Sequence, residues 1–165
     1  HGVEPGRWHE RDQAAEQRQR VEVDGDGAVT ERLLQRDAHQ AVGYLADGTM
    51  IVAVADDGRF VGMGSGGPAP DAPEYGAIYG MWVDPAARGQ RIGEGIIREI
   101  AAWAKGVGYP GIGLGVTVGN TAAIALYERL GFRDTGMRYP LREGTDLEIQ
   151  LMVTSMDDLT AYFAR

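Results

Sequence analysis

The sequence lacks several residue types and patterns that whole classes of function require. None of the 165 residues is cysteine, which excludes disulfides, thiolate-bound metals and cysteine nucleophiles. The histidines, at positions 1, 9 and 39, show no ligand spacing, so we expect no metal site. No apolar run approaches the roughly 18 residues needed to span a bilayer, and no signal peptide is visible. We therefore expect a cytoplasmic protein with no membrane partner.

Basic residues are also few for the length of the chain. Lys and Arg total 16 against 24 Asp and Glu, which leaves a net charge of −8. Nucleic acids favour a basic surface, so we expect no nucleic-acid partner, whereas a cationic small molecule suits an acidic protein. The length of 165 residues, with 44% hydrophobic and 24% charged residues, is ordinary for one globular domain. We expect residues 1–165 to form that single domain.

Hydrophobic periodicity and turn residues predict an alternation of helices and strands. Asp56-Asp57-Gly58 lies between two apolar runs and predicts a hairpin. The predicted elements are a helix at 10–20, a turn at 24–28, a helix at 30–44, a hairpin at 50–63, a loop at 64–73, a strand at 75–83, a helix at 91–107, a strand at 112–118, a helix at 121–130, strands at 132–139 and 147–154, and a helix from 155. This order predicts the α/β class, with a mixed sheet and helices on its faces.

Two of these elements carry a pattern that predicts which side chains face the core. In the strand at 147–154, every second residue is strongly apolar, and this set is expected to be buried: Leu147, Ile149, Leu151 and Val153. In the helix at 121–130, three apolar residues recur at helical spacing: Ala122, Leu126 and Leu130.

Residues 79–97 read YGMWVDPAARGQRIGEGII and place a glycine-containing loop between a strand and a helix. Gln90-x-x-Gly93-x-Gly95 leads into the helix, where free backbone N–H groups and about half a positive charge from the helix dipole attract anions. Arg88 and Arg91 add positive charge. The segment therefore predicts a diphosphate site, and glycines that merely turn the chain are the alternative.

Two other glycine-rich runs fit a nucleotide loop less well. Gly62-x-Gly64-x-Gly66-Gly67 is followed by no helix, and the alternating glycines at 111–115 lie inside a predicted strand. We interpret both as glycine-tolerant backbone. A nucleotide-binding role for the run at 62–67 is the alternative.

A second informative segment, residues 116–132, reads VTVGNTAAIALYERLGF. Asn120 and Tyr127 are seven residues apart, nearly two helical turns, so they share one helix face and could contact one extended ligand. A tyrosine that only packs in the core is the alternative for Tyr127.

Together the two segments closely resemble the GCN5-related N-acetyltransferase family, over roughly residues 45–155. The first matches the family's pyrophosphate motif, Q/R-x-x-G-x-G/A, at Gln90, Gly93 and Gly95. The second matches N-x-x-A-x-x-L-Y-x-x-x-G-F at Asn120, Ala123, Leu126, Tyr127, Gly131 and Phe132. The resemblance implies a mixed, mostly antiparallel sheet that is splayed between the strands ending near 83 and 118, with acetyl-CoA in the split.

The resemblance also implies roles for individual residues. Tyr127 would give a proton to the departing CoA thiolate, and Asn120 would hold the pantetheine arm or an ordered water. The pantetheine arm would pair with backbone of Met81, Trp82 and Val83. The pyrophosphate would be held by Arg88, Gly89, Gln90, Arg91, Ile92, Gly93, Glu94 and Gly95.

The base that deprotonates the acceptor is less clearly implied. Some family members carry a Glu at the position of Ala77 here. Glu74 is retained as the candidate catalytic base, and the alternatives are Tyr75, Tyr79, His39 and a water molecule.

The expected activity is transfer of acetyl from acetyl-CoA to an amine of a small molecule or a peptide. A non-catalytic acetyl-CoA-binding module and transfer of another short acyl group are the alternatives. The family's first strand is not evident, and residues 20–23 are the one weak candidate for it. We therefore expect residues 1–45 to be a diverged or shortened helical part. A homodimer is compatible with the final strand and helix.

Overall fold

The computed structural model describes residues 48–165. The helices predicted at 10–20 and 30–44, the turn at 24–28, the strand candidate at 20–23 and His39 lie outside the described residues. The described elements are β1 Thr49–Val54, β2 Phe60–Pro68, β3 Gly76–Val83, the short 3-10 helix η2 Pro85–Ala87, α3 Ile92–Val107, β4 Gly111–Thr117, α4 Thr121–Arg129, β5 Arg133–Pro140, β6 Glu148–Ser155 and α5 Met156–Phe163.

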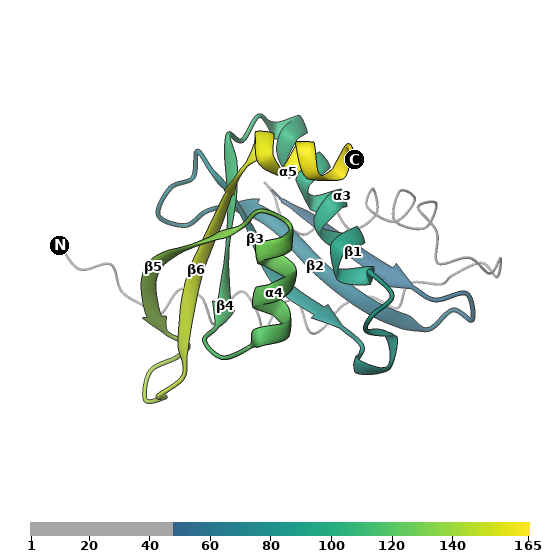
Figure 1. The fold of residues 1–165 in the computed structure, drawn as a ribbon, viewed down its shortest axis with the longest axis horizontal. Coiled ribbons are helices and arrows are strands. Elements are labelled where there is room, and N and C mark those ends of the chain that lie inside the picture. Colours follow the sequence, from purple (N-terminus) through teal and green to yellow (C-terminus); the bar gives the residue numbers. More distant parts are fainter. Residues whose placement is uncertain (1–47) are drawn as a thin grey trace.

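The strands form one sheet in the order β1-β2-β3-β4-β6-β5 (Figure 1). Every neighbouring pair is antiparallel except β3 and β4, which are parallel. The parallel ladder holds only Gly76–Ile78 against Ile112–Leu114, after which the two strands separate. The predicted α/β class, the mixed and mostly antiparallel sheet, and the splay between these two strands are confirmed.

All three described α-helices lie on the same face of the sheet (Figure 1). The core beneath them includes the fully buried side chains of Ile96, Ile97 and Ile100 from α3. Val107 is 54% exposed, because it is the last residue of the helix. None of the described helices is long and apolar enough to cross a membrane.

The glycines of β2 explain how α3 approaches the sheet so closely. A Cβ atom on Gly64 would lie 2.8 Å from Ile96 Cγ2, and one on Gly66 would lie 2.8 Å from Ile100 Cγ2. Both distances are shorter than van der Waals contact, so these positions require glycine. The prediction of a loop at 64–73 was therefore wrong in its first part. The strand continues to Pro68, because the glycines form the surface that the helix covers.

The strand β6 has the predicted alternation but the opposite orientation. Met152 and Thr154 pair with Leu114 and Ile112 and are buried on the helix-bearing face, whereas Leu147 and Val153 are 51% and 41% exposed. Gln150 is buried on the same face as Met152 and Thr154. Alternation identifies two faces but not which one the helices cover.

The apolar side chains of β6 that were predicted to be buried lie instead over the glycines of β4. A Cβ on Gly115 would lie 2.7 Å from Ile149 Cγ2, and one on Gly113 would lie 3.4 Å from Val153 Cγ1. The glycines at 111–115 therefore make space for β6 side chains on the sheet face opposite the helices.

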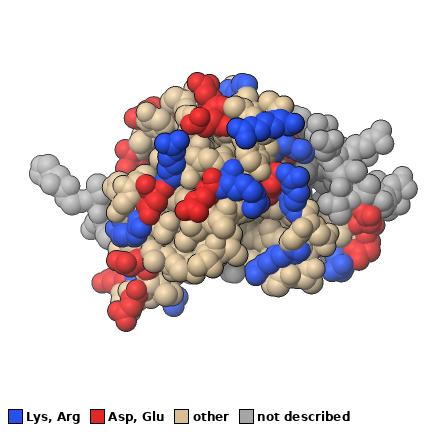
Figure 2. All heavy atoms as spheres, in the orientation of Figure 1, with Lys and Arg blue, Asp and Glu red and all other residues tan. Residues whose placement is uncertain are grey.

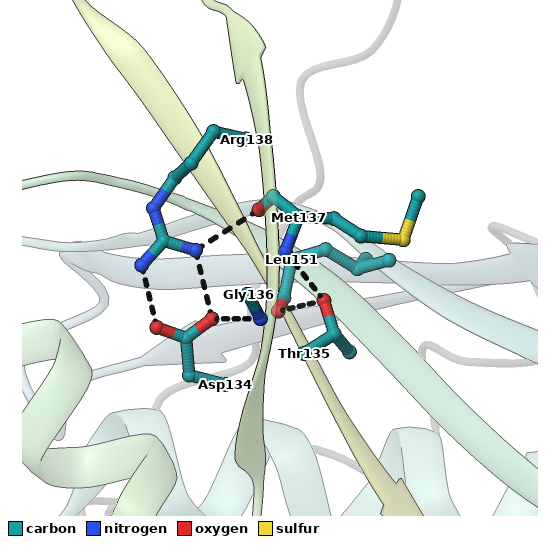
Figure 3. A network of polar contacts seen from close by, with 6 residues as sticks. All are labelled: Asp134, Thr135, Gly136, Met137, Arg138 and Leu151. Carbon is teal, nitrogen blue, oxygen red and sulfur yellow. Dashed lines mark hydrogen bonds and ion pairs between the residues drawn. The ribbon is translucent and has the colours of Figure 1, made fainter.

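The outer strand β5 is interrupted by a bulge (Figure 3). Its pairing with β6 moves from Asp134↔Met152 to Arg138↔Gln150, so three residues lie opposite one. The Asp134 carboxylate accepts hydrogen bonds from Arg138 Nη1 and Nη2, at 2.8 and 2.6 Å, and from the Gly136 N–H. These bonds lower the pKa of Asp134 to about 2. A bulge of this kind breaks the continuous edge that another strand would need for pairing.

Candidate active site

The split between β3 and β4 begins where their ladder ends, at Ile78 and Leu114. Just beyond it, the pairing of β3 with β2 jumps from Ser65↔Tyr79 to Met63↔Trp82. Gly80 stands at this irregularity with a φ of +58°, a left-handed conformation that glycine adopts without strain. From Tyr79 to Val83, β3 has no ladder to β4, so the backbone on that side faces the split.

The predicted anion loop follows β3 directly. Asp84 caps η2 by accepting the Ala86 N–H at 2.9 Å, and the chain then turns through Gly89 (φ +81°) and Arg91 (φ +61°) into α3. No side chain caps α3, so the N–H groups of its first turn lack a capping acceptor. The helix dipole makes such a terminus attractive to anions. The left-handed positions are thus Gly89 and Arg91, while Gly93 and Gly95 lie in the first turn of the helix.

Gly93 faces the interior of the site. A Cβ there would lie 3.2 Å from Leu126 Cδ2 of α4 and 3.6 Å from Val83 Cγ2 of β3. The first turn of α3 therefore abuts the end of β3 and the middle of α4. A Cβ on Gly95 would meet no atom within 4 Å.

Glu94 is the buried carboxylate of this turn, at 8% exposure. It accepts hydrogen bonds from two nitrogens of Arg91, one of them Nε at 3.2 Å, and its Oε2 lies 3.7 Å from Arg129 Nη2. The carboxylate raises the pKa of the Arg91 guanidinium. Basic and acidic side chains lie side by side over the region of α3 and α4 (Figure 2). Arg129 could not be predicted from the sequence, because no spacing rule relates it to a residue on another helix.

The helix α4 begins at the predicted cap. The Asn120 side chain accepts the Ala123 N–H at 3.3 Å, and Gly131, with a φ of +93°, follows the helix end. Of the residues predicted to face inward, Leu130 is buried and Leu126 half-buried, whereas Ala122 is exposed; Tyr127 is buried on the inward face as well. Asn120 is itself exposed, so the two residues expected to share one surface differ in burial.

Tyr127 is 6% exposed, and its ring meets Phe132 edge-on at 5.9 Å. Burial raises the pKa of its phenol above the ordinary value of 10. Its hydroxyl has no hydrogen-bond partner among the described residues. Among the described residues, every fully buried polar side-chain atom has a hydrogen-bond partner. Because the Tyr127 hydroxyl has none, it is not fully buried.

The candidate bases fall at different places along β3. Glu74 and Tyr75 are exposed in the turn before the strand. A strand rises about 3.3 Å per residue, so the segment from Gly76 to Met81 spans about 17 Å. Glu74 therefore lies before the opposite end of β3 from Met81–Val83. Tyr79 is half-buried at the start of the split, and its hydroxyl donates to the Pro68 carbonyl at 2.6 Å.

Of the other residues predicted at this site, Met81 and Val83 are half-buried and Ile92 is buried. Trp82 is 42% exposed and stacks on Phe60, with ring centroids 5.4 Å apart. Arg88, Gly89 and Gln90 are exposed in the loop. The structure thus collects the loop, the end of β3 and the middle of α4 around one split.

Comparison with known proteins gives a consistent result. The model of the acetyltransferase (GNAT) family matches residues 11–132. The N-alpha-acetyltransferase RimI of Mycobacterium tuberculosis is 33% identical over 112 residues, which cover 67% of this chain and 63% of that protein. The mycothiol acetyltransferase of Salinispora arenicola is 41% identical over 64 residues, which cover 38% of this chain and 21% of that protein.

Among solved structures, the crystal structure of nourseothricin acetyltransferase superposes with a TM-score of 0.61 and 26% identity. The match covers 67% of this chain and 66% of that one. The chain thus spans from about a fifth to just under two thirds of the length of these three proteins.

Proposed function

The chain belongs to the acetyltransferase (GNAT) family, and we propose on that premise that it transfers the acetyl group of acetyl-CoA to an amine. The observation that carries the proposal is the split in the sheet, which opens at Ile78 and Leu114 and lies beside the uncapped N-terminus of α3. An extended, anionic ligand fits this combination, because one part can pair with free strand backbone while another lies on free helix amides.

Enzymes of this family use acetyl-CoA, and the described residues suit it. The loop at 88–95 supplies backbone N–H groups and arginines for the diphosphate, and Met81–Val83 supply strand backbone for the amides of the pantetheine arm. Gly93 lets the first turn of α3 pack closely on β3 and α4, since a side chain there would meet Leu126 and Val83. When bound, acetyl-CoA supplies a thioester, an acyl group activated for attack by an amine.

The protein's own groups would then serve three tasks. The acceptor must be a neutral amine, although a simple alkyl ammonium has a pKa of about 10.4, so its proton must leave first. We assign this step to a water, because Glu74 lies in the turn before β3, away from Met81–Val83. Backbone N–H groups between Met81 and Val83 would donate to the acyl oxygen as negative charge develops on it. The N–C bond forms as the C–S bond breaks, and the sulfur gains a proton.

Tyr127 is the group we assign to the sulfur. Its raised pKa keeps the phenol protonated at neutral pH, so it is always a donor there. A thiol has a pKa of about 8.5 and is the stronger acid. The phenol would therefore act first as a hydrogen-bond donor to the developing thiolate. The proton that finally stays on sulfur balances the one lost by the amine.

The acceptor would approach from the sheet face opposite the helices. On the helix-bearing face, the core fills the space above Ile78 and Leu114. On the other face, the half-buried Tyr79 stands on β3 at the start of the split, and β6 side chains lie over Gly113 and Gly115 of β4. We propose a small-molecule amine as the acceptor. The net charge of −8 favours a cationic one.

An amine-dependent assay of CoA release tests the proposal. The purified protein is incubated with acetyl-CoA and each of a panel of amines that includes polyamines, amino acids, aminoglycoside-type antibiotics and N-terminal peptides. We expect CoA release with one amine class and a product heavier by one acetyl group in the mass spectrum. Acetyl-CoA binding without turnover on any amine would favour a non-catalytic module. Faster turnover with propionyl-CoA or succinyl-CoA would point to another acyl group.

A further inference from the structure

The helix that carries Tyr127 is held in place by side chains. Tyr127 and Leu130 lie in the core, and Ala123, Ile124 and Leu126 pack against it, whereas the backbone of α4 approaches no described element as closely as that of α3 approaches the sheet. Its position depends on side chains: Leu126 beside Gly93, Tyr127 on Phe132, the buried Leu130, and the ion pair of Arg129 with Glu94. Within residues 48–165, that ion pair is the one between α4 and α3.

Glu94 is well suited to act as a fixed anchor. Its side chain is only 10% exposed, and a carboxylate at such a place is unfavourable unless cations accompany it. Arg91, at the start of the same helix, donates to both carboxylate oxygens, and Arg129, at the end of α4, lies 3.7 Å from Oε2. The bonds to Arg91 fix the carboxylate relative to the anion loop, so its reach to Arg129 links that loop to α4.

We propose that Glu94 is a positioning residue for the transfer reaction. It holds Arg129 and thereby fixes α4 and the Tyr127 hydroxyl relative to the anion loop at 88–95. This inference rests on the proposed function, because it gives Tyr127 the role at the sulfur. Glu94 itself acts through Arg129 and α4.

The charge of Glu94 separates this role from simple cofactor binding. A carboxylate beside a diphosphate site opposes the binding of an anion. Replacing it with the neutral and nearly isosteric glutamine removes that repulsion and leaves Arg91 and Arg129 uncompensated. Acetyl-CoA affinity should therefore stay equal or improve, while turnover falls because α4 is no longer tied. A residue that only supports the fold would lower both.

The experiment compares Glu94→Gln, Arg129→Met and Arg129→Lys with wild type. We expect Glu94→Gln and Arg129→Met each to lower kcat about three- to tenfold, a usual size for coupled neighbouring residues. Arg129→Lys, which keeps the charge, should restore most of the loss. The Kd for acetyl-CoA in Glu94→Gln should be unchanged or up to about threefold tighter. Arg59→Met is the matched control, because it removes an arginine whose partner Asp57 lies in the β1–β2 turn.

Two further measurements make the result decisive. In a Tyr127→Phe background, Glu94→Gln should lower kcat no further, because the hydroxyl that it positions is absent. Hydrogen exchange should become about fivefold faster in the amides of α4 in Glu94→Gln but stay unchanged in α3. Additive effects on kcat, weaker acetyl-CoA binding in Glu94→Gln, or unaltered exchange in α4 would each overturn the inference. Absence of amine-dependent turnover in wild type would instead overturn the proposed function. The exchange measurement would still test whether the Glu94–Arg129 ion pair holds α4 in place.

Discussion

The close approach of α3 to the glycines of β2 predicts a sharp difference between two adjacent positions. Gly66 faces the helix, and its neighbour Gly67 faces the opposite side of the sheet. Neither has a positive φ, so alanine suits the backbone at both. The substitutions Gly66→Ala and Gly67→Ala therefore add the same methyl group to the same strand and differ only in what it meets.

The structure gives the size of the difference. At Gly66 the new Cβ would lie 2.8 Å from Ile100 Cγ2 and 2.8 Å from Trp103 Cζ3, and the indole ring cannot bend away. Overpacking of this kind costs about 1–3 kcal/mol. At Gly67 the nearest atom is Tyr79 Cε2 at 3.4 Å, an ordinary contact. There the loss of glycine's freedom in the unfolded chain should stabilise the protein by about 0.5 kcal/mol.

Urea unfolding measures both effects. With a slope of about 2 kcal/mol per molar urea, Gly66→Ala should lower the midpoint by about 0.5–1.5 M, and Gly67→Ala should leave it unchanged or raise it slightly. Equal midpoints for the two variants, or a larger loss for Gly67→Ala, would refute the packing argument. Loss of nucleotide binding in Gly66→Ala with unchanged stability would revive a nucleotide role for the run at 62–67.

Three further predictions concern the site and the outer strand. Gly93→Asp should weaken acetyl-CoA binding at least 100-fold in titration calorimetry, because like charges about 4 Å apart repel by about 4 kcal/mol at an effective dielectric constant of 20. The control is Gly106→Asp, which adds the same charge in open space on the same helix, and equal losses of affinity in the two variants would contradict the assignment of the anion loop. Tyr127→Phe should lower kcat about 100-fold and abolish the fall of kcat above pH 10 that ionisation of the buried phenol predicts. A variant that turns over as fast as wild type would show that Tyr127 only packs in the core. Asp134 has a pKa of about 2 beside Arg138 and 3.8 when unfolded, so its stabilising contribution is complete above pH 3.8 and is lost as pH falls through about 2. Asp134→Asn should therefore flatten the acid unfolding curve between these two pH values, and an unchanged curve would contradict the stabilising pairing of Asp134 with Arg138.

The elements around the candidate site follow closely from the sequence. The strand ending at Val83, the helix from Ile92 and the cap at Asn120 each depend on local signals, such as apolar periodicity, a capping amide and glycines at turns. Such signals act within a few residues of the chain, so they can be recognised without knowledge of the fold.

Other features depend on what lies across the fold. The extension of β2 to Pro68 follows from α3 packing on its glycines, and the orientation of β6 follows from its register with β4. The pairing of Glu94 with Arg129 joins two helices that are separated by a strand. Short windows of sequence contain no information about these contacts, because each partner is brought close only by the packed sheet.

The most direct test of the account is a calorimetric titration of the purified protein with acetyl-CoA, followed by addition of the amine panel to the saturated complex. We expect one acetyl-CoA to bind per chain and amine-dependent release of CoA with one class of amine. A titration without binding heat, accompanied by no change in thermal stability at saturating acetyl-CoA, would contradict acetyl-CoA binding at the split and leave the glycines at 89–95 with only a structural role.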